Sequence, residues 1–112
     1  MSLVQLADRI ASRLNRTPTV IQSPRAKDRL ERMIVCTGGA QDYITKAQRY
    51  GADIYLSGEI SERTTHEARE LGVHYIAAGH HATERYGVQA LGSKISQTMG
   101  LETAFFDDHN PA

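Results

Sequence analysis

Three short apolar segments, each followed by a glycine, impose the strongest constraint on how this chain can fold. They are residues 33–37, 53–57 and 74–78, followed by Gly38, Gly58 and Gly79 at intervals of 20 and 21 residues. A segment with helical periodicity follows each glycine. Because strands that alternate with helices through short loops form right-handed crossovers, we predict a single α/β domain over residues 1–112, with a mostly parallel sheet and flanking helices.

The remaining elements follow from capping residues, prolines and apolar spacing. Ser2 and Gln5 have the spacing of a capping box, which marks the start of an N-terminal helix. Pro18 and Pro24 flank a short β-branched run that favours an edge strand. We expect the strand at 33–37 to be buried. The predicted helices are 3–15, 41–50, 62–71 and 81–99, and the further predicted strands are 19–21 and 103–106.

The composition is that of an ordinary globular protein. With 112 residues, 40% of them hydrophobic and 23% charged, the chain is large enough for one core. Its 13 basic and 13 acidic residues cancel, which argues against a nucleic-acid or membrane partner held by bulk charge. We see no bilayer-spanning run and no signal-peptide pattern, and the lone Cys36 excludes an internal disulfide. We therefore expect a cytoplasmic protein in which any metal site uses nitrogen and oxygen ligands.

The three glycine loops are predicted to lie at one edge of the sheet. In open α/β sheets, ligands bind outside the carboxyl ends of the strands. Here those ends lead into residues 37–39, 57–59 and 79–81. Glu59 and His80 are therefore expected to face the same crevice.

The residues near this edge leave several interpretations open. Glu59 could be a metal ligand, a general base, or a carboxylate at a helix N-terminus. Gly38–Gly39 could cradle a phosphate on backbone N–H groups or simply allow a tight turn, and the loop lacks the Lys-Ser/Thr of a P-loop. His66, alone on the following helix, is typical of a solvent-facing or packing residue.

A polar pair heads an apolar stripe on the last predicted helix. Steps of three and four residues place six side chains on one face: His80, Glu84, Val88, Leu91, Ile95 and Met99. Because the later members are apolar, we expect this face to point into a core. A carboxylate there is costly unless it is paired, and a metal ion would satisfy both the carboxylate and the imidazole. A surface hydrogen bond, or a carboxylate favoured by the helix dipole, explains the same spacing without a metal.

The segment Gly79–Val88 and its surroundings resemble a known family. Its sequence GHHATERYGV, preceded by Ser57–Gly58–Glu59 and His66 and followed by Asn110–Pro111, is similar to the Nif-three-like family. Members of that family are dinuclear-metal proteins of α/β fold, often named GTP cyclohydrolase I type 2 homologues. The likeness extends over nearly the whole chain.

The resemblance implies a metal site with assigned residues. In the family, the first His of the motif and the Glu four residues later are metal ligands, so His80 and Glu84 are the expected ligands here. Glu59 and His66 match positions near the site, whereas no ligand role follows for His81. The implied cofactors are divalent Zn, Fe, Mn or Ni ions. Metal-dependent hydrolysis and GTP ring opening are the implied activities, in ring-like homo-oligomers.

The chain also departs from the family pattern. Members are about twice as long, and their first half supplies a His-His-Pro-type segment and a later Asp that complete the metal shell. The only adjacent histidines here are His80 and His81, so the chain resembles the C-terminal half. Because two ligands would hold a metal weakly, the expected partners are further copies of the chain or a missing N-terminal half. One alternative is a non-catalytic oligomerisation or binding module; another is a metal-free nucleotide-binding module.

Overall fold

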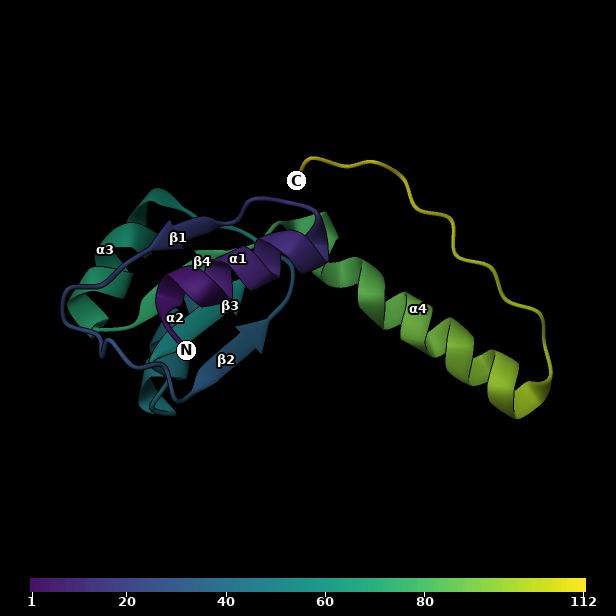
Figure 1. Cartoon of the computed structure of the whole chain (residues 1–112), viewed down its shortest axis with the longest axis horizontal. Helices are drawn as coiled ribbons and strands as arrows, with labels where there is room; N and C mark the ends of the chain where they lie inside the picture. Colours follow the sequence, from purple (N-terminus) through teal and green to yellow (C-terminus); the bar gives the residue numbers. More distant parts are fainter.

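Two short, fully buried strands form the centre of a four-stranded sheet in the computed structural model, which describes residues 1–112 (Figure 1). These are β3 (Ile54–Ser57) and β4 (His74–Ala77), in which every residue is buried. The sheet order is β1-β4-β3-β2, so that β1 (Thr19–Ile21) and β2 (Met33–Cys36) form the two edges. The prediction of an α/β fold is thus confirmed.

The sheet is mixed, which corrects the expectation of a mostly parallel one. The pairs β2/β3 and β3/β4 are parallel, with Val35 beside Leu56 and Leu56 beside Ile76. In contrast, β1 pairs with β4 in the antiparallel direction. The physical reason lies in the connections: a helix separates the strands of each parallel pair, whereas no helix joins β1 to β2 across residues 22–32. The edge position predicted for 19–21 is confirmed.

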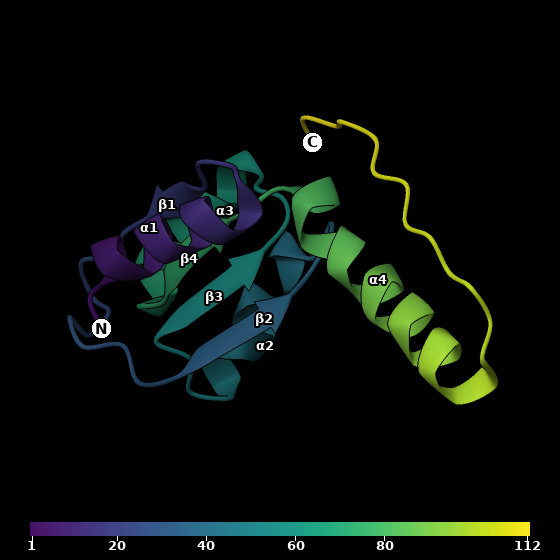
Figure 2. The same ribbon diagram turned by 45° about the vertical axis from the view of Figure 1, so that its right-hand side comes forward.

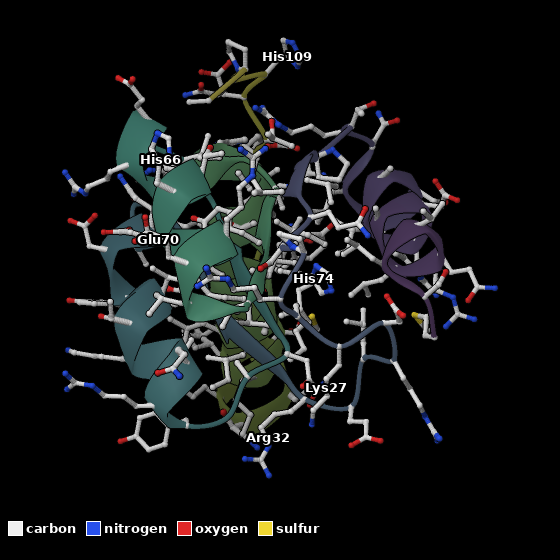
Figure 3. All side chains as sticks on the ribbon, turned by 90° about the vertical axis from the view of Figure 1, so that its left-hand side faces the viewer. Lys27, Arg32, His66, Glu70, His74 and His109 are labelled. Atoms are coloured by element: carbon white, nitrogen blue, oxygen red, sulfur yellow. The ribbon has the colours of Figure 1, made fainter.

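Helices cover both faces of the sheet. On one face lies α1 (Leu3–Leu14), which begins with the predicted capping box of Ser2 and Gln5. On the other face lie α2 (Ile44–Arg49) and α3 (Glu62–Leu71), as the end-on view shows (Figure 3). The predicted helix at 41–50 begins as a 3-10 turn, η1 (Gln41–Tyr43), before α2. This three-layer arrangement explains why β3 and β4 are buried throughout.

Each face of the sheet has its own core. Towards α1, the strand residues Ile54, Leu56, Ile76 and Ala78 pack against an apolar stripe that consists of Leu3, Leu6, Ile10 and Leu14. Towards α2 and α3, the largest buried side chains are Tyr55 and Tyr75, whose rings meet edge to face at 5.7 Å. The alternation of side chains along β3 and β4 therefore supplies both cores.

The strand at 33–37 is not buried as predicted. Met33 and Val35 are 46% and 50% exposed, because β2 is an edge strand whose outer neighbour is solvent. An apolar run of this kind occurs both in central strands and in edge strands whose outer side no other element covers. The pattern therefore could not distinguish the two.

The last helix, α4 (His80–Met99), does not point its apolar stripe into a core as predicted. Ala82 is its only buried residue, and Val88, Leu91 and Met99 are 58%, 60% and 70% exposed. A helix of 20 residues is about 30 Å long, and α4 extends beyond the sheet as an arm (Figures 1 and 2). Its first turns contact the end of α1, through hydrogen bonds from Arg85 and Tyr86.

The strand predicted at 103–106 is absent. Residues 100–112 have no regular structure, and Phe105 and Phe106 are 42% and 89% exposed. The reason is distance, because α4 carries the chain away from both sheet edges before these residues are reached (Figure 1). No helix in the structure has the length and apolar character needed to cross a membrane.

Candidate functional site

The three glycine loops meet at one edge of the sheet, as predicted. The N–H of Gly58 donates to the carbonyl of Gly38 at 3.0 Å, and the N–H of Gly79 donates to that of Gly58 at 2.9 Å. Figure 2 shows the arrowheads of β2 and β3 directed at the first turn of α4. The parallel strands therefore deliver their carboxyl ends, and the residues that follow them, to one place.

Close packing at this edge depends on glycine. Gly38 has a φ of +68°, and a Cβ there would lie 2.2 Å from Glu84 Oε1. A Cβ at Gly58 would lie 2.8 Å from the Cα of His80. The Gly38 N–H donates to Thr83 Oγ1 at 3.1 Å, which ties this loop to α4. The first glycine loop thus makes a tight turn and also leaves room for a carboxylate.

His80 lies between two carboxylates. Its Nδ1 is 2.5 Å from Glu59 Oε1, and its Nε2 is 3.1 Å from Glu84 Oε2. The side chains of His80, Glu59 and Glu84 are 38%, 45% and 52% exposed. The hydrogen bond to Glu59, with the nearby charge of Glu84, raises the pKa of His80 above its ordinary value against the opposing effect of desolvation. The predicted meeting of Glu59 and His80 is confirmed.

The position of the Glu59 main chain is fixed by a hydrogen bond from the Tyr75 side chain. The hydroxyl of Tyr75 donates to the Glu59 carbonyl at 2.5 Å, and burial raises the pKa of Tyr75 to about 12. Tyr75 therefore keeps its proton at neutral pH and holds the loop after β3 from within the core. The protonated ring can donate to both carboxylates, whereas in the neutral ring Glu59 favours the proton on Nδ1 and leaves Nε2 as the nitrogen available to a ligand.

The two carboxylates do not converge on one point, because they face opposite nitrogens of the same ring. No group of three or more His, Cys, Asp or Glu side chains in the chain is arranged to hold a metal ion. His80 and Glu84 are the two side chains here that could contact one ion together, and Glu59 contacts the opposite nitrogen of the imidazole.

His66 does not join this group. It is exposed on α3 and forms no hydrogen bond or ion pair with His80, Glu59 or Glu84. Figure 3 shows it on α3, in the helical layer opposite α1.

A second polar cluster, which the sequence patterns did not indicate, lies beside the first turns of α4. Asp107 accepts hydrogen bonds from His81 Nε2 at 3.1 Å and Arg85 Nη1 at 2.8 Å. The hydrogen bond from His81, with the neighbouring Arg85, lowers the pKa of Asp107. Arg16 Nη1 donates to the main-chain oxygens of Pro111 and Ala112. Because the partners are far apart in the chain, no local spacing could have predicted these contacts.

The chain is similar to several known proteins of greater length. It is 51% identical over 107 residues to a Vibrio cholerae protein named GTP cyclohydrolase 1 type 2 homolog, covering 96% of this chain and 42% of that one. A protein of the same name from Allochromatium vinosum is 48% identical, with 100% of this chain and 43% of the relative covered. The chain therefore spans less than half the length of these relatives.

Solved structures agree with this picture. The structure of protein ybgI, described as of unknown function, superposes with a TM-score of 0.91 at 43% identity, covering 97% of this chain and 44% of that one. The structure of TTHA1606 from Thermus thermophilus superposes with a TM-score of 0.89 at 31% identity, covering 100% and 44%. The family model Duf34/NIF3 (NGG1p interacting factor 3) matches residues 1–111. This chain belongs to the DUF34/NIF3 family.

Proposed function

We propose that this chain is a metal-binding protein that corresponds to the C-terminal half of a dinuclear-metal hydrolase-like protein. His80 and Glu84 are its proposed ligands for a divalent Zn, Fe, Mn or Ni ion. The observation that carries this proposal is the 3.1 Å separation of His80 Nε2 and Glu84 Oε2 at the carboxyl edge of the parallel strands. The names of the relatives, GTP cyclohydrolase 1 type 2 homolog, agree with such a hydrolase-like role.

The chemistry and spacing of these residues fit a metal ion. Ligand distances of about 2.0–2.2 Å for His nitrogen and carboxylate oxygen place two neighbouring ligand atoms of one ion roughly 3 Å apart. A histidine that ligates through Nε2 commonly donates its Nδ1–H to a carboxylate, which fixes the ring and raises its basicity. Glu59 occupies that position. We therefore propose that Glu59 orients His80 and is not itself a ligand of the metal ion.

The chain's own residues would prepare the site before the ion arrives. Glu59 holds the proton on Nδ1 of His80, and Gly38 leaves the space that the Glu84 carboxylate uses. A bound ion would polarise a substrate oxygen or lower the pKa of bound water. Because catalytic zinc sites ordinarily use three protein ligands, the remaining ligands are proposed to come from an N-terminal half or another copy of this chain in a homo-oligomer.

A second candidate function is a non-catalytic oligomerisation or binding module. The exposed apolar side chains of α4, Val88, Leu91 and Met99, favour it, since they form a surface that nothing in the fold covers. Under this alternative the chain keeps the family fold without a working metal site. In either case we propose a cytoplasmic location.

The test is the metal content per chain of the purified wild type, measured by elemental analysis after gel filtration. His80→Ala removes the proposed ligand, and His66→Ala is the matched control, because it removes another helical imidazole at an exposed position. Metal ions in the wild type and in His66→Ala, lost in His80→Ala, support the proposal. A wild type that stays free of metal after incubation with zinc, manganese, iron and nickel contradicts it for this chain and favours the binding module.

A further inference from the structure

The two faces of the sheet are covered unequally. Two helices, α2 and α3, pack on one face, whereas α1 lies alone on the other (Figure 3). Neighbouring strands are about 4.8 Å apart and packed helices about 8–10 Å apart, so a sheet of four strands has room for two helices on each face. The face that carries α1 therefore leaves about the width of one helix uncovered.

The uncovered width lies over β2. The apolar stripe of α1 packs against side chains from β1, β3 and β4 and the residue after β4, and no residue of β2 belongs to that core. Met33 and Val35 are in parallel register with Ile54 and Leu56, so they point to the same face as those two core residues. They are nevertheless 46% and 50% exposed. Two apolar side chains of β2 thus lie beside α1 and remain open to solvent.

Two apolar hollows lie in line between α1 and β2, and together they are here called the groove. Side chains of α1, β2 and β3 line both hollows: Ile10, Leu14, Val35 and Leu56 line the first, of about 270 Å³, and Leu6, Met33 and Ile54 line the second, of about 190 Å³. The groove therefore follows β2, whose four residues span about 13 Å.

The outer part of α4, residues 87–99, is here called the arm, and it carries a surface that fits this groove. Its apolar stripe consists of Val88, Leu91, Ile95 and Met99, with the spacing by which an amphipathic helix anchors in an apolar groove. Three of these side chains are more than half exposed. The stripe is about 16 Å long, close to the length of the groove. Lys94, the single charged residue of the arm, is not part of the stripe.

The arm cannot reach the groove of its own chain. Thr83 and Tyr86, in the turns before the arm, line the first hollow. From there α4 runs away from the sheet (Figures 1 and 2). Because α4 is a continuous helix, its stripe would reach that groove only if the helix broke near its base. The groove of a second copy is open to the arm without any such break.

We infer that two copies of this chain exchange their arms, so that each arm lies in the groove between α1 and β2 of the other copy. A two-fold axis that places one arm in the partner's groove places the partner's arm in the first groove, and the assembly closes as a dimer. Both apolar surfaces of both copies are then covered. The proposal rests on the second candidate function, for which it names the partner and the surface, and it does not involve the metal ligands.

The size of this contact favours exchange over simpler contacts. A stable interface takes about 20–30 residues from each partner. Nine residues line the first hollow, seven line the second, and residues 87–99 supply the arm. Contacts between two arms alone, or between two grooves alone, would use about half of that surface.

The experiment is sedimentation equilibrium of the full chain in the presence of a chelator. We expect the mass of two chains, with a Kd of about 10 μM or tighter, so that most chains are dimeric at about 100 μM. Leu91→Glu alters the arm and Val35→Glu alters the groove. Each should weaken the dimer about a hundredfold or more, because each places a charge against apolar side chains and occurs twice in a symmetric dimer.

Val4→Glu is the matched control. It makes the same substitution on α1 at a side chain that is 70% exposed and lines neither hollow. It should change the Kd less than about threefold. Circular dichroism checks the fold of each variant. If Val35→Glu does not fold, Met33→Glu replaces it, because Met33 lines the other hollow of the groove.

Mixing the two variants separates arm exchange from other dimers. In an equimolar mixture, the intact arm of the Val35→Glu chain meets the intact groove of the Leu91→Glu chain, while the doubly altered contact can open. The mixture should associate at least about tenfold more tightly than either variant alone, because the two substitutions then share one contact. A mixture that stays as weak as its components contradicts exchange.

Three other outcomes overturn the proposal. A wild type that is monomeric at about 100 μM excludes the dimer. A Val35→Glu chain that dimerises as the wild type does would indicate contact through the arms alone, and a Leu91→Glu chain that does so would indicate contact through β2 alone. Metal content is measured on the same preparation: a monomer that holds metal refutes the exchange and leaves the metal proposal intact, and a metal-free dimer does the reverse.

Discussion

The two ends of β3 and β4 carry the same kinds of residue in opposite circumstances. Just before and at their starts lie Asp53 and His74, which are 7% and 2% exposed. Beyond their ends lie Glu59 and His80, whose side chains are 45% and 38% exposed. Each edge thus has one carboxylate and one imidazole from neighbouring strands. What differs is the partner that each side chain has.

At the buried edge, backbone groups bond to both nitrogens of His74 and to Oδ2 of Asp53. The Ser23 N–H donates to His74 Nδ1 at 3.2 Å, so His74 Nε2–H donates to the Lys27 carbonyl at 3.2 Å. Asp53 Oδ2 accepts from the N–H groups of Glu31 and Arg32, each at 2.9 Å. These bonds fasten the long β1–β2 loop to the sheet. His74 and Asp53 are therefore structural residues.

At the open edge, the partners are side chains that can move. His80 meets two carboxylates, and neither Glu59 nor Glu84 is buried. Exposed carboxylates can exchange a hydrogen bond for a ligand without leaving a buried group unsatisfied. The comparison teaches that residue type alone does not identify a site: the buried pair is held mainly by backbone groups, whereas the open pair is held by exposed side chains.

Replacing each histidine in turn gives the strongest test of whether the buried edge is structural and the open edge is not. His74→Ala leaves the Ser23 N–H and the Lys27 carbonyl without partners, so we expect it to lower the free energy of unfolding by about 2–4 kcal/mol. His80→Ala should change that free energy by less than about 0.5 kcal/mol, while abolishing metal binding. Urea denaturation and elemental analysis of both variants give the two readouts. A strongly destabilised His80→Ala would make the open edge structural as well.

Asp53→Ala tests the carboxylate of the buried edge. Removing it leaves two N–H groups unpaired, and we expect a loss of about 1–3 kcal/mol of stability at pH 7. Burial acts to raise the pKa of Asp53, but the N–H donors of Glu31 and Arg32 and the charge of Lys27 bring it below its ordinary value of 3.8. Its contribution is therefore present above about pH 4 and lost as the pH falls through the folded-state pKa. Urea midpoints of wild type and variant should accordingly converge in acid.

Gly38→Ala and Gly100→Ala form a matched pair that tests the space around Glu84. Both glycines have a φ of +68°, so alanine strains the backbone by about 1–2 kcal/mol at each. At Gly38 the new methyl group collides with Glu84, whereas nothing lies within 4 Å at Gly100. We expect metal affinity to fall about tenfold or more in Gly38→Ala and to stay unchanged in Gly100→Ala. Equal metal affinities would show that Glu84 is not a ligand.

Glu59→Gln should have the smallest effect, and it reports on the orientation of His80. Because Glu59 raises the pKa of His80, a proton competes with metal at a higher pH than it would for an isolated histidine. The variant should move the pH midpoint of metal binding downward and weaken binding at high pH, by about tenfold on the scale of outer-shell effects. Metal titrations between about pH 5 and pH 8 measure both changes. An unchanged midpoint would mean that Glu59 does not act through His80.

Much of the fold follows from local patterns. The apolar runs before Gly38, Gly58 and Gly79 located β2, β3 and β4, because a short apolar run that ends at a turn-forming glycine is typical of a strand. Ser2 and Gln5 located the start of α1, since a capping box is a local interaction. The rule for parallel strands also predicts that Glu59 and His80 meet at one edge of the sheet.

Other features could not be predicted, because they depend on what lies next to a segment in space. The apolar spacing on α4 is a real helical stripe, but no local rule says whether another element covers it. The direction of β1 likewise depended on its pairing with β4, 54 to 58 residues away in register (Thr19 with Ala77, Ile21 with Tyr75). His66 matched a family position, yet it forms no hydrogen bond or ion pair with His80, Glu59 or Glu84.

Periodicity, capping and glycine spacing were enough to establish the helices and the four strands of the sheet, the α/β class and the meeting of Glu59 with His80, because these depend on interactions within one turn, one strand or one crossover. Only the folded chain decided that the sheet is mixed and that α4 is an exposed arm. It also decided that Arg16 lies against Gly79 and that Asp107 returns to the first turns of α4. Those contacts join residues more than 60 positions apart in some cases, and their energy depends on three-dimensional proximity that no short stretch of sequence encodes.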